Sequence, residues 1–130
     1  MSGPFKLSDA KTIPGRADYF TGKVSLTDLM PPQAPGAMTY KWVSFEPGAR
    51  TNWHTHVFAQ DLYVVAGECR VQVEGGKILK LQAGEMFHFP AGVLHWHGAG
   101  PSLPCIHLAI NGDGATDWKH AVDEKEYQAG

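Results

Sequence analysis

The chain has 130 residues, of which 43% are hydrophobic and 18% charged, and its formal net charge is −2. This length fits one domain, since single hydrophobic cores hold roughly 100–150 residues. The charge balance offers no basic surface for nucleic acid or anionic lipid, and the hydrophobic pattern contains neither a signal peptide nor a membrane span. We therefore expect a cytoplasmic protein whose partners are small molecules, with no nucleic acid and no membrane among them.

Short runs with alternating or β-branched character follow one another from Ala37 onward and are separated by Gly and Pro. In chain order, they predict strands over 39–45, 60–66, 69–73, 78–81, 86–89, 94–98 and 105–110. An earlier strand is predicted near 23–26. Asp123 followed by Glu126 predicts a short helical turn over 124–127. This spacing is typical of an antiparallel sandwich or barrel.

The same pattern divides the single domain into three parts. Residues 1–36 are predicted to form an N-terminal arm with an edge strand, residues 37–112 the barrel core, and residues 113–130 a C-terminal strand and short helical turn packed on the same domain. Strand 60–66 is apolar on both faces, so one face lines the barrel and the other needs a cover from the arm or a partner subunit. We expect a homodimer or homotetramer with symmetric contacts.

The two cysteines, Cys69 and Cys105, show no CxxC spacing and lie in alternating apolar runs. They do not suggest a disulfide framework. We predict that both are buried free thiols.

The placement of the histidines indicates a metal site. His54 and His56 are separated by one residue, so on an extended strand both side chains leave the same face, with Cα atoms about 6–7 Å apart. Two imidazoles at this spacing can converge on one ion. Gln60 stands at the start of the next strand, and His95 follows a Pro-x-Gly turn on a distant strand.

Two motifs around these residues resemble those of the cupin superfamily. The first cupin motif, which normally carries Glu at the position of Gln60, resembles Gly48-(x5)-His54-x-His56-(x3)-Gln60-(x6)-Gly67. The second, whose usual later Asn is replaced here by Ala99, resembles Gly84-(x5)-Pro90-x-Gly92-(x2)-His95. The resemblance implies an all-β fold, the antiparallel double-stranded β-helix or jelly-roll barrel. It also implies one divalent metal per subunit, held by His54, His56, Gln60 and His95.

A closer resemblance links the chain to the small bacterial cupins that include manganese-dependent hydroxynitrile lyases. It rests on the blocks 45–56, 95–99 and 107–110. That group also has glutamine as its fourth ligand, so manganese is the favoured metal, although an all-N/O ligand set also suits Fe, Ni or Zn. Because Gln60 is neutral, the ion keeps its full 2+ charge and polarises a bound oxygen strongly.

Three further residues are candidates for catalysis. His97 is two residues from His95 and shares its face. His107 faces the cavity if its aliphatic neighbours pack between the sheets, and the resemblance places the corresponding histidine in the active site. Either residue is a natural general base, while the alternative for His107 is a core histidine bonded to a backbone carbonyl. Lys41 is either a cavity cation or a solvated side chain.

The function predicted from these residues is a metal-dependent lyase of the hydroxynitrile type, acting on small carbonyl or cyanohydrin substrates. One alternative is a dioxygenase that uses Fe or Mn at the same ligands. The other is a non-catalytic cupin that binds a small ligand.

Overall fold

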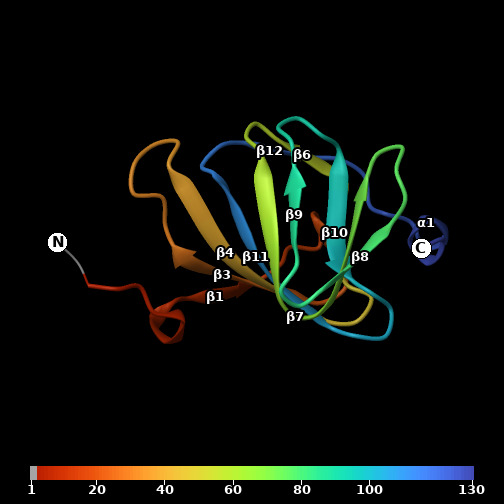
Figure 1. Cartoon of the computed structure of the whole chain (residues 1–130), viewed down its shortest axis with the longest axis horizontal. Helices are drawn as coiled ribbons and strands as arrows, with labels where there is room; N and C mark the ends of the chain where they lie inside the picture. The colour runs from red at the N-terminus through yellow and green to blue at the C-terminus, as the bar shows by residue number, and fades with distance from the viewer. Residues whose placement is uncertain (1–2) are drawn as a thin grey trace.

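The computed structural model describes residues 3–130, which are organised almost entirely in strands (Figure 1). The strands are β1 (Thr12–Pro14), β2 (Phe20–Thr21), β3 (Val24–Met30), β4 (Met38–Phe45), β5 (Arg50–Thr51), β6 (His54–His56), β7 (Gln60–Val73), β8 (Leu79–Gln82), β9 (Met86–Phe89), β10 (His95–Ala99), β11 (Cys105–Gly112) and β12 (Thr116–Trp118). A single 3-10 turn, η1 (Leu7–Asp9), precedes β1, and helix α1 (Glu124–Gln128) lies near the C-terminus.

The strands form one strongly curled antiparallel sheet. Its main path runs β1-β3-β4-β11-β7-β10-β5-β2, while β6 pairs with β10 and β12, and β8 and β9 pair with β7. In Figure 1 the sheet bends so that β4 and β11 face β10 across the interior, as in a partly closed barrel. The predicted all-β antiparallel fold is confirmed.

Strand β7 differs from the prediction because the segments 60–66 and 69–73 form one continuous strand. Its first part pairs with β9 and β11, and its second part pairs with β8 and β10. Gly67 lies between the two parts with a φ of +75°, and a Cβ there would overlap the carbonyl of Pro104. The glycine therefore permits a close strand approach rather than a chain reversal. The predicted faces are confirmed, since Leu62 and Val64 are fully buried while Tyr63 is 39% exposed.

Two clusters of buried side chains support the sheet. The main cluster fills the concave side and includes Val43, Phe45, Leu62, Val64, Val71 and Phe89. The second cluster lies on the outer face of β10, where the C-terminal segment packs, and consists of Trp53, Trp96, Val122 and Tyr127. The strand that carries His95 and His97 is therefore covered on both faces, which holds its side chains in place.

Polar contacts hold the C-terminal segment against β10. The buried Arg50 guanidinium donates to the Val122 carbonyl at 2.9 Å and lies 4.1 Å from the centroid of the Tyr127 ring. The Tyr127 hydroxyl donates to the Ala99 carbonyl at 2.5 Å. The Asp123 side chain accepts from the Glu126 amide at 2.8 Å, which confirms the predicted helical turn.

Cys69 and Cys105 form a disulfide, with Cα atoms 5.2 Å apart, so the prediction of free thiols was wrong. The pairing of β11 with β7 places Cys105 opposite Gly67, two residues from Cys69. This cross-strand proximity depends on a register that local sequence patterns do not encode.

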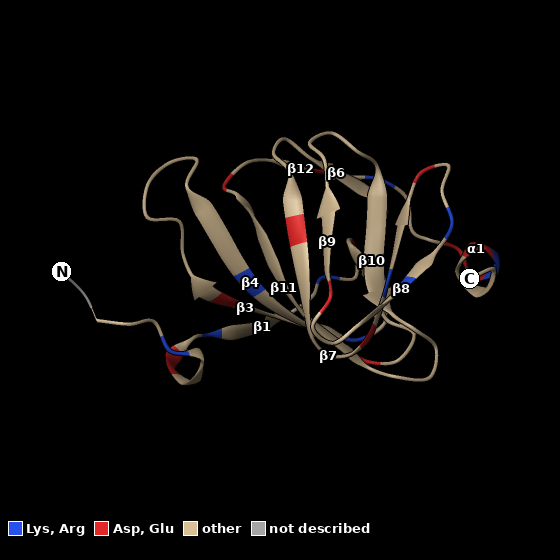
Figure 2. Ribbon diagram, in the orientation of Figure 1, with Lys and Arg blue, Asp and Glu red and all other residues tan. Residues whose placement is uncertain are grey.

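Acidic and basic residues are interspersed over the ribbon in Figure 2. Within residues 3–130, no helix has the length and apolar composition needed to cross a membrane.

Candidate metal centre

The four predicted metal ligands lie together at one end of the curled sheet. His54 and His56 come from β6, and His95 on β10 is directly opposite His54 in the β6–β10 pair. The ring centroids are 4.3 Å apart for His54 and His95, 4.9 Å for His54 and His56, and 5.4 Å for His56 and His95. Gln60, at the start of β7, has its Oε1 atom 3.3 Å from Nε2 of His95.

Hydrogen bonds to neighbouring groups hold all four side chains in place. The Nδ1 atoms of His54 and His95 donate to the carbonyls of Asn52 and Val93, at 2.8 and 2.9 Å. The Nδ1 atom of His56 lies 3.1 Å from the Thr116 hydroxyl, and its buried Nε2 atom has no protein partner. The Gln60 amide nitrogen donates to Asn111 at 3.2 Å, which leaves its oxygen for the histidines. These contacts occupy the Nδ1 atoms of the three histidines and leave their Nε2 atoms and the Gln60 oxygen available to a metal, as is typical of metal-binding histidines.

The contacts of His95 point specifically to a cation. Both of its ring nitrogens face an oxygen acceptor, the Val93 carbonyl on one side and Gln60 Oε1 on the other. A neutral imidazole has a single N–H, so it satisfies only one of them. Burial lowers the pKa of His95 from 6.5 to about 4, which disfavours the doubly protonated form at neutral pH. A positive ion between His95 and Gln60 resolves this conflict, so the residues present fit a divalent metal.

The other histidines of the cluster are also held neutral. Burial, together with the neighbouring His95, lowers the pKa of His54 well below 6.5, and burial lowers the pKa of His56. Neutral imidazole is the form that binds metal, so no proton has to be displaced near pH 7.

Three buried histidines, His54, His95 and His97, have ligand atoms within 4.8 Å of one another and could hold a metal ion. This set contains His97 in place of His56, which was predicted as a ligand. We nevertheless place His97 beside the ligands, because its ring centroid is 5.3 Å from His54 and 5.8 Å from His95, farther than that of His56 in each case. His97 also uses Nδ1 for His107, while its Nε2 atom is buried without a protein partner.

His97 and His107 form a buried pair behind the cluster. Nε2 of His107 lies 2.9 Å from Nδ1 of His97. Burial lowers the pKa of His107 to about 3. Burial, followed by the effect of the neighbouring His107, also lowers the pKa of His97 well below 6.5. His107 lies on the buried face of β11, as the alternation predicted, and its neighbour on that face, Ala109, lines the cavity. His97 also lines the cavity, whereas His107 is fully buried and is not among the lining residues.

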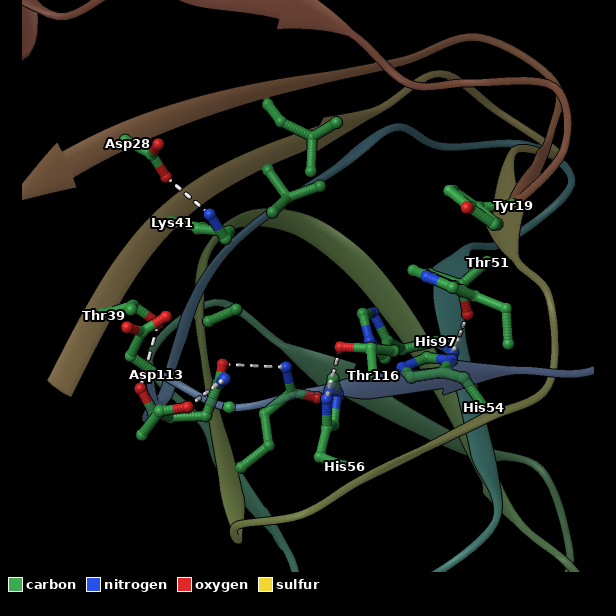
Figure 3. Close-up of a pocket in the computed structure, with 18 of the residues that line it drawn as sticks. Tyr19, Asp28, Thr39, Lys41, Thr51, His54, His56, His97, Asp113 and Thr116 are labelled. Atoms are coloured by element: carbon green, nitrogen blue, oxygen red, sulfur yellow. Dashed lines mark hydrogen bonds and ion pairs between the residues drawn. The ribbon is translucent and has the colours of Figure 1, made fainter. Parts of the chain in front are cut away.

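The cavity beside the cluster has a volume of about 520 Å³ and is lined by both apolar and polar residues. Figure 3 shows the cluster histidines and the polar side chains around this cavity. Lys41 lines its outer part and forms an ion pair with Asp28, with Nζ and Oδ1 2.6 Å apart. Lys41 is therefore both a cavity residue and a partly solvated one.

Several residues of the site were missed by sequence reasoning. Trp118 lines the cavity with its ring centroid 4.7 Å from that of His54, and it stacks on Tyr19 at 4.6 Å. Thr116 supports His56, and Asn111 supports Gln60. These residues lie outside the two motifs, although the alternation of Thr116 and Trp118 does fit an inward-facing strand.

Comparison with known proteins agrees with this architecture. The family described as "Cupin domain" matches residues 41–111. A protein of Granulicella tundricola named (R)-mandelonitrile lyase is 43% identical over 117 residues, which cover 88% of this chain and 89% of that protein.

Solved structures also resemble the chain. A cupin-like protein from Thermotoga maritima superimposes with a TM-score of 0.86 at 35% identity, covering 89% of this chain and 90% of its own. The polyketide cyclase RemF from Streptomyces resistomycificus has a TM-score of 0.74 at 19% identity over 98% and 92% of the two chains, a likeness of fold alone. Because the family match spans more than half of the sequence and two relatives exceed 30% identity over most of it, this chain belongs to the cupin family.

Proposed function

We propose that this protein is a metal-dependent lyase of the hydroxynitrile type, which breaks or forms the C–C bond of a small cyanohydrin. The observation that carries the proposal is the proximity of the His54, His56 and His95 rings and the Gln60 oxygen beside a cavity. The relative named (R)-mandelonitrile lyase supports this reaction class.

The four residues would hold one divalent ion, with manganese favoured by the resemblance and Fe, Ni or Zn also compatible with N/O ligands. When bound, such an ion supplies Lewis acidity to a substrate oxygen in the cavity, undiminished by ligand charge because all four side chains are neutral.

His97 is placed to move the proton. His97 lines the cavity, its buried Nε2 atom has no protein partner, and its Nδ1–H can donate to Nε2 of His107, which leaves a lone pair on Nε2 of His97. In cleavage, His97 takes the hydroxyl proton, the oxygen electrons form the C=O bond, and the C–C electron pair leaves with cyanide. His97 then returns the proton, so the products are an aldehyde and HCN. His107 acts as a positioning residue that keeps the His97 ring and tautomer in place.

The test combines metal analysis with assays of mandelonitrile cleavage and O₂ uptake. We expect manganese-loaded protein to cleave the cyanohydrin without O₂ uptake. His97→Asn should lower cleavage by about 100-fold or more with unchanged metal content, while His56→Ala should lose the metal. His120→Asn, at an exposed histidine away from the cavity, serves as the control. Iron-dependent O₂ consumption with no cyanohydrin cleavage would contradict the lyase and favour the oxygenase.

A further inference from the structure

A second, smaller cavity adjoins the main one. Its volume is about 210 Å³, and it lies between β3, β4 and the start of β1. Leu26, Asp28 and Lys41 line both cavities, so these three side chains form the boundary between them. Lys11 and Ile13 complete the wall on the far side.

The boundary contains the ion pair of Lys41 and Asp28, drawn as a dashed line in Figure 3. The two side chains are 42% and 62% exposed, so neither is locked in the core. An ammonium group has three donors, and the contact with Asp28 at 2.6 Å uses one of them. Lys41 therefore retains donors for a further acceptor.

The charges on the two walls differ in sign. The charged residues of the main cavity are Lys41, Asp28 and Asp113, two acids against one base. Those of the smaller cavity are Lys11, Lys41 and Asp28, two bases against one acid. In Figure 2 the blue bands on β4 and at the start of β1 lie on either side of the red band on β3. The side chains of the smaller cavity therefore carry a net positive charge, which favours an anionic group there.

We propose that the smaller cavity is a subsite for the remote, anionic end of the substrate, with Lys41 and Lys11 as its cations. This deepens the proposed function and rests on it for the reacting end. Lys41 and Val43 share one face of β4, with Cα atoms about 7 Å apart, and Val43 pairs with His107. The substrate class is then a small molecule with its hydroxyl or carbonyl near His97 and a carboxylate at the opposite end. Leu26 and Ile13 supply the apolar walls.

The test uses two unreactive probes, 4-(hydroxymethyl)benzoate and benzyl alcohol, with metal-free protein, so that the carboxylate has no ion to bind among the histidines. Calorimetry should show the acid binding about fivefold more tightly than the alcohol, the size expected for a partly exposed ion pair. Lys41→Met should abolish this preference, and Asp28→Asn should increase it, because the competing carboxylate is gone. Lys80→Met, at an exposed lysine on β8, matches the charge change away from the cavity and should have no effect.

Opposite effects of Lys41→Met and Asp28→Asn on the preference for the acid indicate a binding role for Lys41. A merely structural role would lower the affinity for both probes in both variants. Equal affinity for the two probes, no measurable binding of the acid, or an equal loss of both in Lys41→Met would overturn the subsite. A clear preference for the acid in a protein that cleaves no cyanohydrin would refute the lyase and leave the subsite intact. Cyanohydrin cleavage by a protein that shows no preference for the acid would support the lyase and refute the subsite.

Discussion

Replacing Gln60 by Glu tests the role of a neutral ligand most directly. The substitution preserves the shape of the side chain and puts a carboxylate oxygen about where Oε1 now lies, 3.3 Å from Nε2 of His95. At an effective dielectric constant of about 20, a negative charge at this distance attracts a proton on His95 by about 5 kcal/mol. That is enough to bring the pKa of His95 from about 4 to near neutrality or above in the metal-free protein.

The same charge has opposite effects on binding and turnover. A carboxylate in place of an amide should tighten metal binding, since it adds Coulomb attraction to the ion. It should also weaken the polarisation of the substrate oxygen, because part of the ion's charge is neutralised. We expect Gln60→Glu to keep or gain metal and to lose at least about tenfold in cyanohydrin cleavage, which corresponds to only about 1.4 kcal/mol of barrier. Gln60→Ala should lose metal affinity.

Metal affinity is measured by competition with a chelator, turnover by the release of aldehyde, and the His95 pKa by NMR on metal-free protein. Gln82→Glu, the same chemical change on the exposed side of β8, is the control. If Gln60→Glu is fully active while Gln60→Ala retains its metal unchanged, Gln60 is not a ligand and the charge argument fails.

Three further predictions follow from the buried histidines and the outer face of the sheet. His107→Leu removes the hydrogen-bond partner of His97 Nδ1. It should lower kcat about tenfold, the effect expected for the loss of one good hydrogen bond, and leave KM and metal content unchanged. A parallel loss of metal would refute a pure positioning role for His107. Metal-free protein should lose stability as the pH falls below 6.5, because His107 has a pKa of about 3 when folded and 6.5 when unfolded, so the unfolded chain takes up more protons. The loss from His107 is about 2 kcal/mol at pH 5, and urea unfolding at pH 7 and 5 in EDTA should show it; a flat profile would exclude it. We expect Tyr63 and Met86, 39% and 56% exposed on neighbouring strands, to lie in the contact of a homodimer or homotetramer, which a monomer in light scattering at micromolar concentration would contradict.

Local patterns in the sequence were sufficient for most of the secondary structure. Short alternating or β-branched runs bounded by Gly and Pro located β4, β9, β10 and β11 to within one or two residues, because side chains on a strand alternate between its faces and Gly and Pro mark its ends. The prediction of two separate strands, 60–66 and 69–73, was wrong, because β7 continues through Gly67, whose positive φ serves a close strand approach as well as a turn. The disulfide was missed for a similar reason, since Cys69 and Cys105 are 36 residues apart and meet only through the β7–β11 register.

The sequence by itself determined the fold class and the four side chains that the structure brings together, because the spacing of His54, His56, Gln60 and His95 follows from strand periodicity and from the motifs they belong to. Only the tertiary structure decided which residues surround them. It placed His97 in the cavity wall with His107 behind it, brought Trp118 and Thr116 to the cluster, and left Lys41 between two cavities. These relations depend on how distant strands pair and how far the sheet curls. Strand pairing and sheet curvature are both set by the packing of the whole core and cannot be predicted from any local segment of the sequence.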